Sequence, residues 1–345
     1  MTKISTIFAG LAVAILGGLA LMPSASAADV TLTTSDNIQN AIAAADNGDT
    51  IYLSAGTYDV AAAVTIESGK SVNLVGQGSV TINLTSAAPG RVLKIYDTSN
   101  VNVSNINLTT NATGNNPPTW GGDMGVDISN ACNVTLSNVS ISNVGKFGIE
   151  VTASQLGTET NCTSTDSVTF NNITVTNSTG GIAFYDTNSS GSVTEPLTNI
   201  SFTGTTTITG TNYGIDLNDG SGVASITSPN SLELNLGTLV TSNVTTPIIT
   251  NAADKVALND DSVINGTALS TLTAADLETL LGLPTGSITI NSTAAPIEPA
   301  KPAPSVPNTG VAQSNLMLNI VIIATILFTL AIGTAGILKL SRERS

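Results

Sequence analysis

The 345-residue chain contains no histidine at all. Catalytic arrangements of the Ser-His-Asp and Cys-His types are therefore excluded, because each uses histidine as its general base. Sites for zinc and other imidazole-bound metals are not expected either. Aromatic residues make up only 3% of the chain, with a single tryptophan. Any chemistry must rest on carboxylates, amides, hydroxyls and a few basic groups.

Basic residues are scarce as well. Ten lysines and arginines stand against 24 aspartates and glutamates, which gives a net charge of −14. A surface of this sign repels nucleic acid and anionic lipid. DNA and RNA are therefore excluded as partners, whereas cations could be attracted.

The N-terminal residues 1–27 have the pattern of a secretory signal peptide. A basic start at Lys3 precedes an apolar run from Ile7 to Met22, and the segment closes with Ala25-Ser26-Ala27. Small residues of this A-x-A type are what a signal peptidase accepts. An N-terminal membrane anchor is the alternative, but the apolar run is short and ends at a cleavage site.

The C-terminal end has four parts. Residues 294–305 are a Pro/Ala-rich spacer, expected to be extended and semi-rigid. The sequence VPNTG follows at 306–310, and 316–338 form an apolar segment of 23 residues. A helix of that length can span a bilayer. The chain closes with a basic tail at 339–345, which would stay cytoplasmic.

This order resembles the cell-wall sorting signal of LPxTG-type surface proteins. The resemblance implies that a sortase-like transpeptidase recognises the motif, attacks the carbonyl of Thr309 and joins the protein to the cell wall. Valine stands where that family usually has leucine. A permanent single-pass anchor is the alternative, and both interpretations place residues 28–293 on the cell surface. The motif residues are Val306, Pro307, Asn308, Thr309 and Gly310.

The two cysteines of the chain, Cys132 and Cys162, lie within this exported region. Export makes a disulfide plausible. Closing a loop of about 30 residues would add roughly 3–4 kcal/mol in the chain-entropy model. Unpaired thiols are the alternative, since the sequence does not give the distance between the two residues.

Residues 35–48 predict a short amphipathic helix that must cover the open end of a sheet, with Ser35 as its N-cap. Short strands follow and repeat every 33 or 34 residues. One column of this repeat holds Asn105, Asn138 and Asn172, and Gly204 occupies the same place in a fourth copy. Asn and Gly both tolerate the left-handed αL conformation. We therefore predict a tight bend here, with the Asn amides stacked as a ladder.

A second column consists of the segments GVDI (125–128), GIEV (148–151), GIAF (181–184) and GIDL (214–217). A period of 23 to 34 residues with several short strands predicts a solenoid whose coils bury apolar side chains on one another. The repeat fades from 223 to 293, where 271–282 predicts a second short helix with Thr273 as N-cap.

These patterns, together with the opening GDTIYLSAGTYDV (48–60), resemble the right-handed parallel β-helix of the pectate-lyase-like superfamily. The expected fold is an all-β solenoid over residues 28–293 with short capping helices, followed by the C-terminal transmembrane helix.

The acids of the second column form the candidate site. Strand alternation places Asp127 and Glu150 on the outer face of successive coils, with Lys146 just before the second. Close carboxylates raise one another's pKa or recruit a cation such as Ca²⁺. The resemblance implies Ca²⁺-binding acids and a lysine base, as in polysaccharide lyases. The alternative is a solvated strand face, favoured by Ala183 within the acid column and by Arg91 as the only arginine of the domain.

The Gly-rich segment GIDLNDGSG (214–222) supplies two further Ca²⁺ candidates, Asp216 and Asp219. Acidic Gly-containing turns are common without a metal, so ordinary turn chemistry is the alternative.

From these patterns we predict a surface-displayed structural or adhesive module that binds polysaccharide or another surface. A Ca²⁺-assisted polysaccharide lyase and a passive stalk or coat protein are the alternatives.

Overall fold

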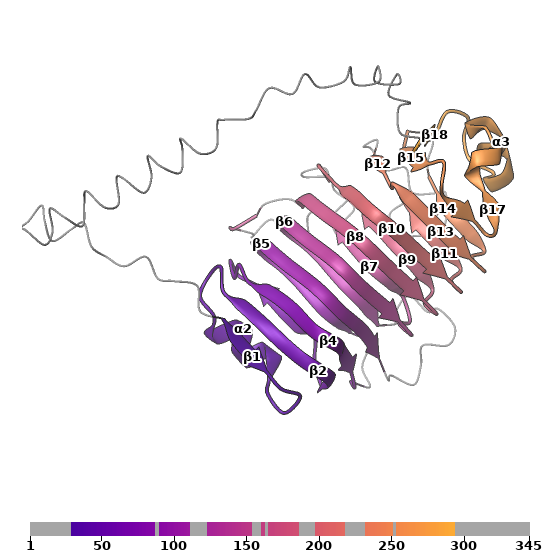
Figure 1. The fold of residues 1–345 in the computed structure, drawn as a ribbon. Helices are drawn as coiled ribbons and strands as arrows, with labels where there is room; N and C mark the ends of the chain where they lie inside the picture. Colours follow the sequence, from indigo (N-terminus) through magenta and orange to yellow (C-terminus); the bar gives the residue numbers. More distant parts are fainter. Residues whose placement is uncertain are drawn as a thin grey trace, which may run out of the picture. The chain divides into compact units, whose positions relative to one another are not determined.

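The computed structural model describes residues 29–86, 90–110, 123–153, 160–162, 165–185, 197–217, 232–250 and 253–293. These residues form a stack of parallel β-coils, with β1 and β2 at one end and β18 and the helix α3 at the other (Figure 1). The predicted all-β, β-helix-like fold is confirmed at this level. None of the helices in the described ranges is long and apolar enough to cross a membrane. The predicted signal peptide, spacer, sorting motif and membrane span lie outside the described residues.

The strands of the first half of the stack are long because several of them bend across two or three faces. They are β1 (Val30–Leu32), β2 (Thr50–Val60), β3 (Val64–Glu67), β4 (Asn73–Leu84), β5 (Arg91–Thr110), β6 (Met124–Ser142), β7 (Phe147–Thr152), β8 (Asp166–Thr176) and β9 (Gly180–Tyr185). The second half contains β10 (Ser201–Thr209), β11 (Tyr213–Asp216), β12 (Glu233–Asn235), β13 (Thr238–Ser242), β14 (Thr246–Ile249), β15 (Lys255–Asn259), β16 (Val263–Ile264), β17 (Thr267–Ala268) and β18 (Ile288–Asn291).

Three faces result from the strand pairing. Face A runs through β1, residues 50–54, 73–77, 101–104, 134–137, 168–171 and 201–203, then β12, β15 and β18. Face B runs through residues 56–60, 80–84, 106–110, 139–142, 173–176 and 205–209, then β13 and β16. Face C runs through β3, residues 91–96 and 124–129, then β7, β9, β11 and β14. Among the described strands, β16 and β17 alone pair antiparallel.

Asparagines in the αL conformation form the corners between faces. Asn105, Asn138 and Asn172 turn the chain from face A to face B with φ of 58°, 53° and 53°. The amide of Asn138 donates to Asn105 Oδ1 at 2.9 Å, and that of Asn172 donates to Asn138 Oδ1 at 3.1 Å. The structure thus contains the ladder that the 33-residue spacing predicts. Gly204, with φ of 66°, occupies the next corner.

The other two corners use the same residue type. Between faces C and A, Asn133 donates to Asn100 Oδ1 at 2.6 Å, and both residues have positive φ. Between faces B and C, Asn143 and Asn177 have φ of 56° and 50°. A residue that tolerates αL therefore sets the bend at each of these corners.

Aliphatic side chains fill the interior along every strand. The buried apolar residues of the described chain form one cluster that extends from Leu32 to Ile288. This core is complete without residues 294–345, so a chain of residues 28–309 is expected to fold on its own.

Short helices cover parts of the two ends. α2 (Ile38–Ala44) buries Ile38 and Ile42, and α3 (Ala274–Leu281) buries Leu277. The prediction of Ser35 as N-cap of α2 was wrong, because the Asn37 side chain accepts from the backbone N–H of Asn40. In α3 the predicted N-cap, Thr273, forms a reciprocal capping box with Asp276.

Candidate functional site on face C

One outward column of face C carries most of the charge of the site. Lys94, Asp127, Glu150, Ala183 and Asp216 occupy successive rungs in register. Their aliphatic neighbours along each strand belong to the core, so strand alternation turns this column outward. The sequence predicted the column from Asp127 onward.

The acids of this column are buried, although their strand positions face outward. Asp127 is 0% exposed and Glu150 is 7% exposed. The alternative of a solvated strand face is therefore wrong for these two residues. Removing a carboxylate from water is costly unless a cation or hydrogen-bond donors compensate it.

A cation compensates each of these two acids. Arg91 Nε donates to Asp127 Oδ2, and Lys146 Nζ lies 2.5 Å from Glu150 Oε2. A third pair on the same face, Lys94 with Glu67, is longer at 3.7 Å and more exposed. Arg91 was missed as a site residue, because the sequence analysis began the column at residue 125.

The three site cations are a large share of the available positive charge. The described chain contains five basic residues, and the other two have structural contacts elsewhere. Lys70 Nζ donates to the carbonyls of Ala43 and Ala45 at the end of α2, and Lys255 Nζ donates to that of Gly286. In an acidic protein, gathering Arg91, Lys94 and Lys146 on one face makes this face locally close to neutral.

The two central carboxylates have different electrostatic environments. Burial raises the pKa of Glu150 above its ordinary value of 4.5, Lys146 lowers it in part, and the charge of Asp127 raises it further. Asp127 is instead held by the guanidinium of Arg91.

Two buried polar atoms at the site have no hydrogen-bond partner in the structure. They are Asp127 Oδ1 and Ser129 Oγ, and both residues are 0% exposed. Ser129 follows Asp127 by two residues, so both side chains leave the same face of the strand. Buried polar groups are nearly always hydrogen-bonded, so these two atoms are exceptions that lie beside the Arg91 ion pair.

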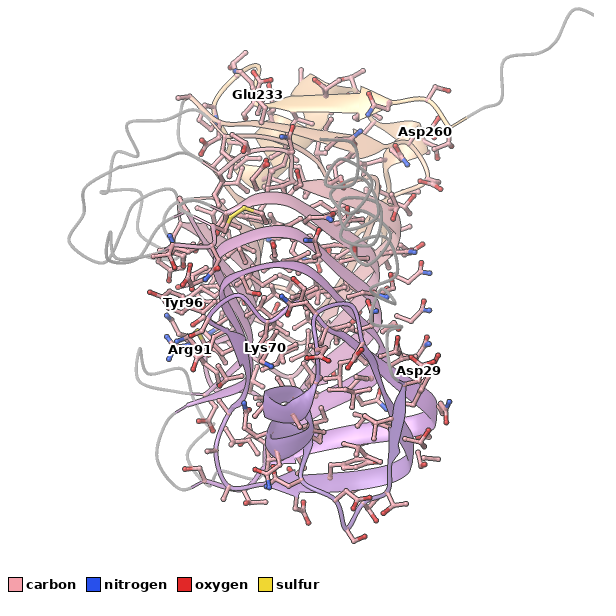
Figure 2. All side chains as sticks on the ribbon, turned by 90° about the vertical axis from the view of Figure 1, so that its left-hand side faces the viewer. Asp29, Lys70, Arg91, Tyr96, Glu233 and Asp260 are labelled. Carbon is pink, nitrogen blue, oxygen red and sulfur yellow. A yellow bond between two sulfur atoms is a disulfide. The ribbon has the colours of Figure 1, made fainter. Side chains whose placement is uncertain are left out.

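Two tyrosines accompany the cations. Lys94 Nζ lies 4.2 Å from the ring centroid of Tyr96, and Lys146 Nζ lies 5.5 Å from that of Tyr185. Figure 2 shows Arg91 and Tyr96 on the same side of the stack. Tyrosine faces next to charged hydrogen-bonding groups are suited to polar ligands with apolar C–H surfaces.

The predicted Ca²⁺ ligands do not form a cation site here. Asp127 forms an ion pair with Arg91, and Glu150 forms one with Lys146. Glu150 and Asp216 are not on adjacent rungs, because the rung of Ala183 lies between them. Asp219 lies outside the described residues. No cluster of three Asp, Glu or Cys side chains able to hold a metal occurs in the described ranges. Calcium binding by these residues therefore stays a prediction.

A disulfide and the carboxylate of Asp97, which is only partly buried, define one border of face C. Cys132, just after the face C part of β6, is bonded to Cys162. Asp97, just after the face C part of β5, accepts from the backbone N–H of Thr160 at 3.0 Å and of Asn161 at 2.9 Å. Residues 160–162 are thus fastened to two coils, next to the ends of the strands that carry the site.

No protein-family model matches the chain, and no curated protein matches it either. Three solved structures show limited similarity. ORF18 of Geobacillus virus E2 is 12% identical with a TM-score of 0.40, and the match covers 75% of this chain and 56% of the viral protein. The chain thus spans little more than half of that protein.

The other two structures are less similar. Alginate lyase from Paenibacillus sp. str. FPU-7 is 14% identical with a TM-score of 0.29, covering 68% of this chain and 92% of the lyase. The A-module of the mannuronan C-5 epimerase AlgE4 of Azotobacter vinelandii is 14% identical with a TM-score of 0.25, covering 64% and 71%. At these TM-scores none of the three likenesses assigns a substrate or a reaction to this chain.

Proposed function

We propose that this protein is a surface-displayed, right-handed β-helix that binds a polysaccharide on face C. The observation that carries the proposal is the partly exposed guanidinium of Arg91, which the buried carboxylate of Asp127 holds in place. This guanidinium supplies donors for a sugar hydroxyl or a uronate carboxylate. Lys94 and the ring of Tyr96 lie on the same face.

The arrangement favours binding over elimination chemistry. A lyase base removes the proton next to the uronate carboxylate while the glycosidic oxygen leaves with a proton from an acid, so the base must begin neutral. Lys146 Nζ already donates to Glu150 Oε2 at 2.5 Å, so it is not free to take a proton from a substrate. The lyase interpretation therefore needs this pair to break when substrate binds.

The test uses purified residues 28–309 and a panel of acidic and neutral polysaccharides, with and without Ca²⁺. Retention on immobilised glycan and release of unsaturated uronates are both recorded. We expect retention without product, weakened at least tenfold by Asp127→Asn. Asp59→Asn is the matched control, because Asp59 is an exposed acid on face B.

Three outcomes would contradict the binding proposal. Equal loss in Asp127→Asn and Asp59→Asn would mean that general charge, and not the site, controls retention. Unsaturated product that disappears in Lys146→Ala would establish a lyase, and Ca²⁺ dependence of that product would restore the cation hypothesis. Absence of both retention and product would favour the stalk or coat.

Surface attachment rests on the sequence motif and has its own test. Replacing Thr309 by alanine removes the residue whose carbonyl a sortase would attack. We expect the variant to lose covalent attachment to the cell wall and to appear in membranes or culture supernatant. Continued covalent attachment would refute the assignment of VPNTG as the sorting motif.

A further inference from the structure

Face B presents two parallel outward columns of small hydrogen-bonding side chains. The strand pairings keep three successive coils in register, with no bulge within this face. The first column is Ser140, Thr174 and Thr207, and the second is Ser142, Thr176 and Thr209. Asn107 and Thr109 continue the two columns onto β5.

Most hydroxyls in this array are free to bind something outside the protein. Among the described residues, no hydrogen bond engages the hydroxyls of Thr174, Thr176 or Thr207. Ser142 Oγ donates to Thr109 Oγ1 at 3.4 Å, so this one pair of face B is engaged within the face. Some hydroxyls of face A are engaged as well. There Thr169 and Ser201 hydrogen-bond to each other at 3.0 Å, and Thr203 donates to the carbonyl of Phe170 at 3.4 Å.

A second feature of the same face is a buried acceptor without a partner. Asn83 lies in the second column near the N-terminal end of the stack and is 5% exposed. Its amide nitrogen donates to Asp59 at 2.6 Å, whereas its Oδ1 has no hydrogen-bond partner. This buried atom does not face the surroundings, but the hydroxyls of face B can each both donate and accept.

The charge pattern identifies the kind of surface that would match this face. From β5 to β10 the two columns contain no charged residue, although the protein has a net charge of −14. A charged polymer or an anionic membrane would therefore find no opposite charge to pair with on these columns. The two columns also contain no aromatic ring over these coils, and rings are the usual means of stacking on sugar faces. An uncharged, ordered, hydrogen-bonding surface remains.

The spacing of the array is regular in two directions. Adjacent rungs repeat at about 4.7–4.9 Å, and residues i and i+2 on one strand lie about 6.6–6.8 Å apart. Oxygen atoms on a prism face of hexagonal ice form a flat lattice with similar repeats. We propose that face B binds ice, with hydroxyls in register with lattice oxygens and threonine methyl groups against the layer between them.

The experiment compares residues 28–309 with variants of faces B and A. Thermal hysteresis and inhibition of ice recrystallisation are measured, and circular dichroism checks that each variant is folded. Thr176→Lys places a long charged side chain in the centre of the array, and we expect at least a tenfold loss of activity. Thr135→Lys, the same change on face A, is the control and should retain activity. Asp127→Asn on face C should retain it as well, which separates this proposal from polysaccharide binding.

Several results would overturn the proposal. The unaltered chain could lack both ice activities, or Thr176→Lys could retain them in full. Loss of retention on crystalline cellulose or chitin in Thr176→Lys, without any ice activity in the unaltered chain, would assign face B to a glycan. Conversion of a dimer to a monomer by Thr176→Lys in sedimentation would assign it to a second copy of this chain.

Discussion

Replacing Lys146 by methionine leaves the Glu150 carboxylate without its cation, while a methionine of similar length still fills the space. The side chains of Lys146 and Glu150 are 16% and 9% exposed, so the pair is largely removed from water. Removing one partner of a buried ion pair costs roughly 3–5 kcal/mol. Because Lys146 retains some exposure, we expect a loss near the lower limit, about 3 kcal/mol at pH 7. For a domain of this size that corresponds to a fall in Tm of roughly 6–12 °C.

The pH dependence has a defined sign. A carboxyl whose folded pKa lies above its unfolded value binds more protons when folded, so stability falls as pH rises from the unfolded pKa to the folded one. For Glu150 this interval begins near 4.5. Loss of Lys146 removes an influence that lowers this pKa, so the interval should widen. The stability difference between variant and parent should therefore be largest at neutral pH and shrink towards pH 4.5.

Thermal and urea unfolding between pH 4 and 8, followed by circular dichroism, would measure both effects. The double variant Lys146→Met/Glu150→Gln removes the charge as well as its partner and should recover most of the loss. Lys94→Met is the matched control, because its pair with Glu67 is longer and more exposed, and should cost less than about 1 kcal/mol. A cost below about 1 kcal/mol for Lys146→Met, or no recovery in the double variant, would refute burial of the pair.

Three further predictions concern the scaffold. Asn138→Ala should lower the unfolding free energy by about 1–2 kcal/mol more than Asn138→Gly, because Asn138 has positive φ and glycine adopts αL more freely than alanine. Urea unfolding of the two variants at equal ionic strength would measure this difference. Reduction of the Cys132–Cys162 disulfide, or replacement of both cysteines by serine, should lower the unfolding free energy by roughly 3–4 kcal/mol. As a control, adding reductant should leave the Tm of the serine variant unchanged. For Asp97, burial alone would raise the pKa, but hydrogen bonds from Asn161, Thr160 and Cys162 lower it below 3.8. Its stabilising contribution is thus present above pH 3.8 and lost as pH falls through the folded pKa, so Asp97→Asn should flatten acid unfolding there.

The sequence predicted the repeat well because the physical cause of the repeat is local. Asn105, Asn138 and Asn172 stand at equal spacing since each must adopt αL at the same corner, and no distant contact is needed to see it. The other corners follow the same rule. Asn100 and Asn133, again 33 residues apart, were available as a signal and were missed.

The candidate site was only partly predictable. Register alone places Asp127 next to Glu150, and a step of 33 residues backwards from Asp127 reaches Lys94. Arg91 lies three residues before Lys94 and pairs with Met124, so the column does not predict its contact with Asp127. Burial was not predictable, because alternation shows which way a side chain leaves a strand but not whether water reaches it. The assumption that an outward acid is a solvated acid caused the error.

The buried acids of the described chain differ in what they contact, and this difference bears on function. Asp254 accepts from the backbone N–H of Leu232, and Glu278 accepts from that of Ile288, so these carboxylates hold the backbone in place. Asp127 and Glu150 instead form their hydrogen bonds with cationic side chains, Arg91 and Lys146.

A buried ion pair of this kind contributes little net stability, and apolar side chains of similar volume would often serve a scaffold as well or better. A passive stalk therefore has no use for two such pairs on adjacent rungs, each contacting a side chain that is still partly exposed. A binding face can use such pairs. They hold the charged groups of Arg91 and Lys146 in fixed positions and partly shielded from water, so a ligand that contacts them displaces little water. The stability cost of these pairs is thus consistent with the proposal that face C is the binding face.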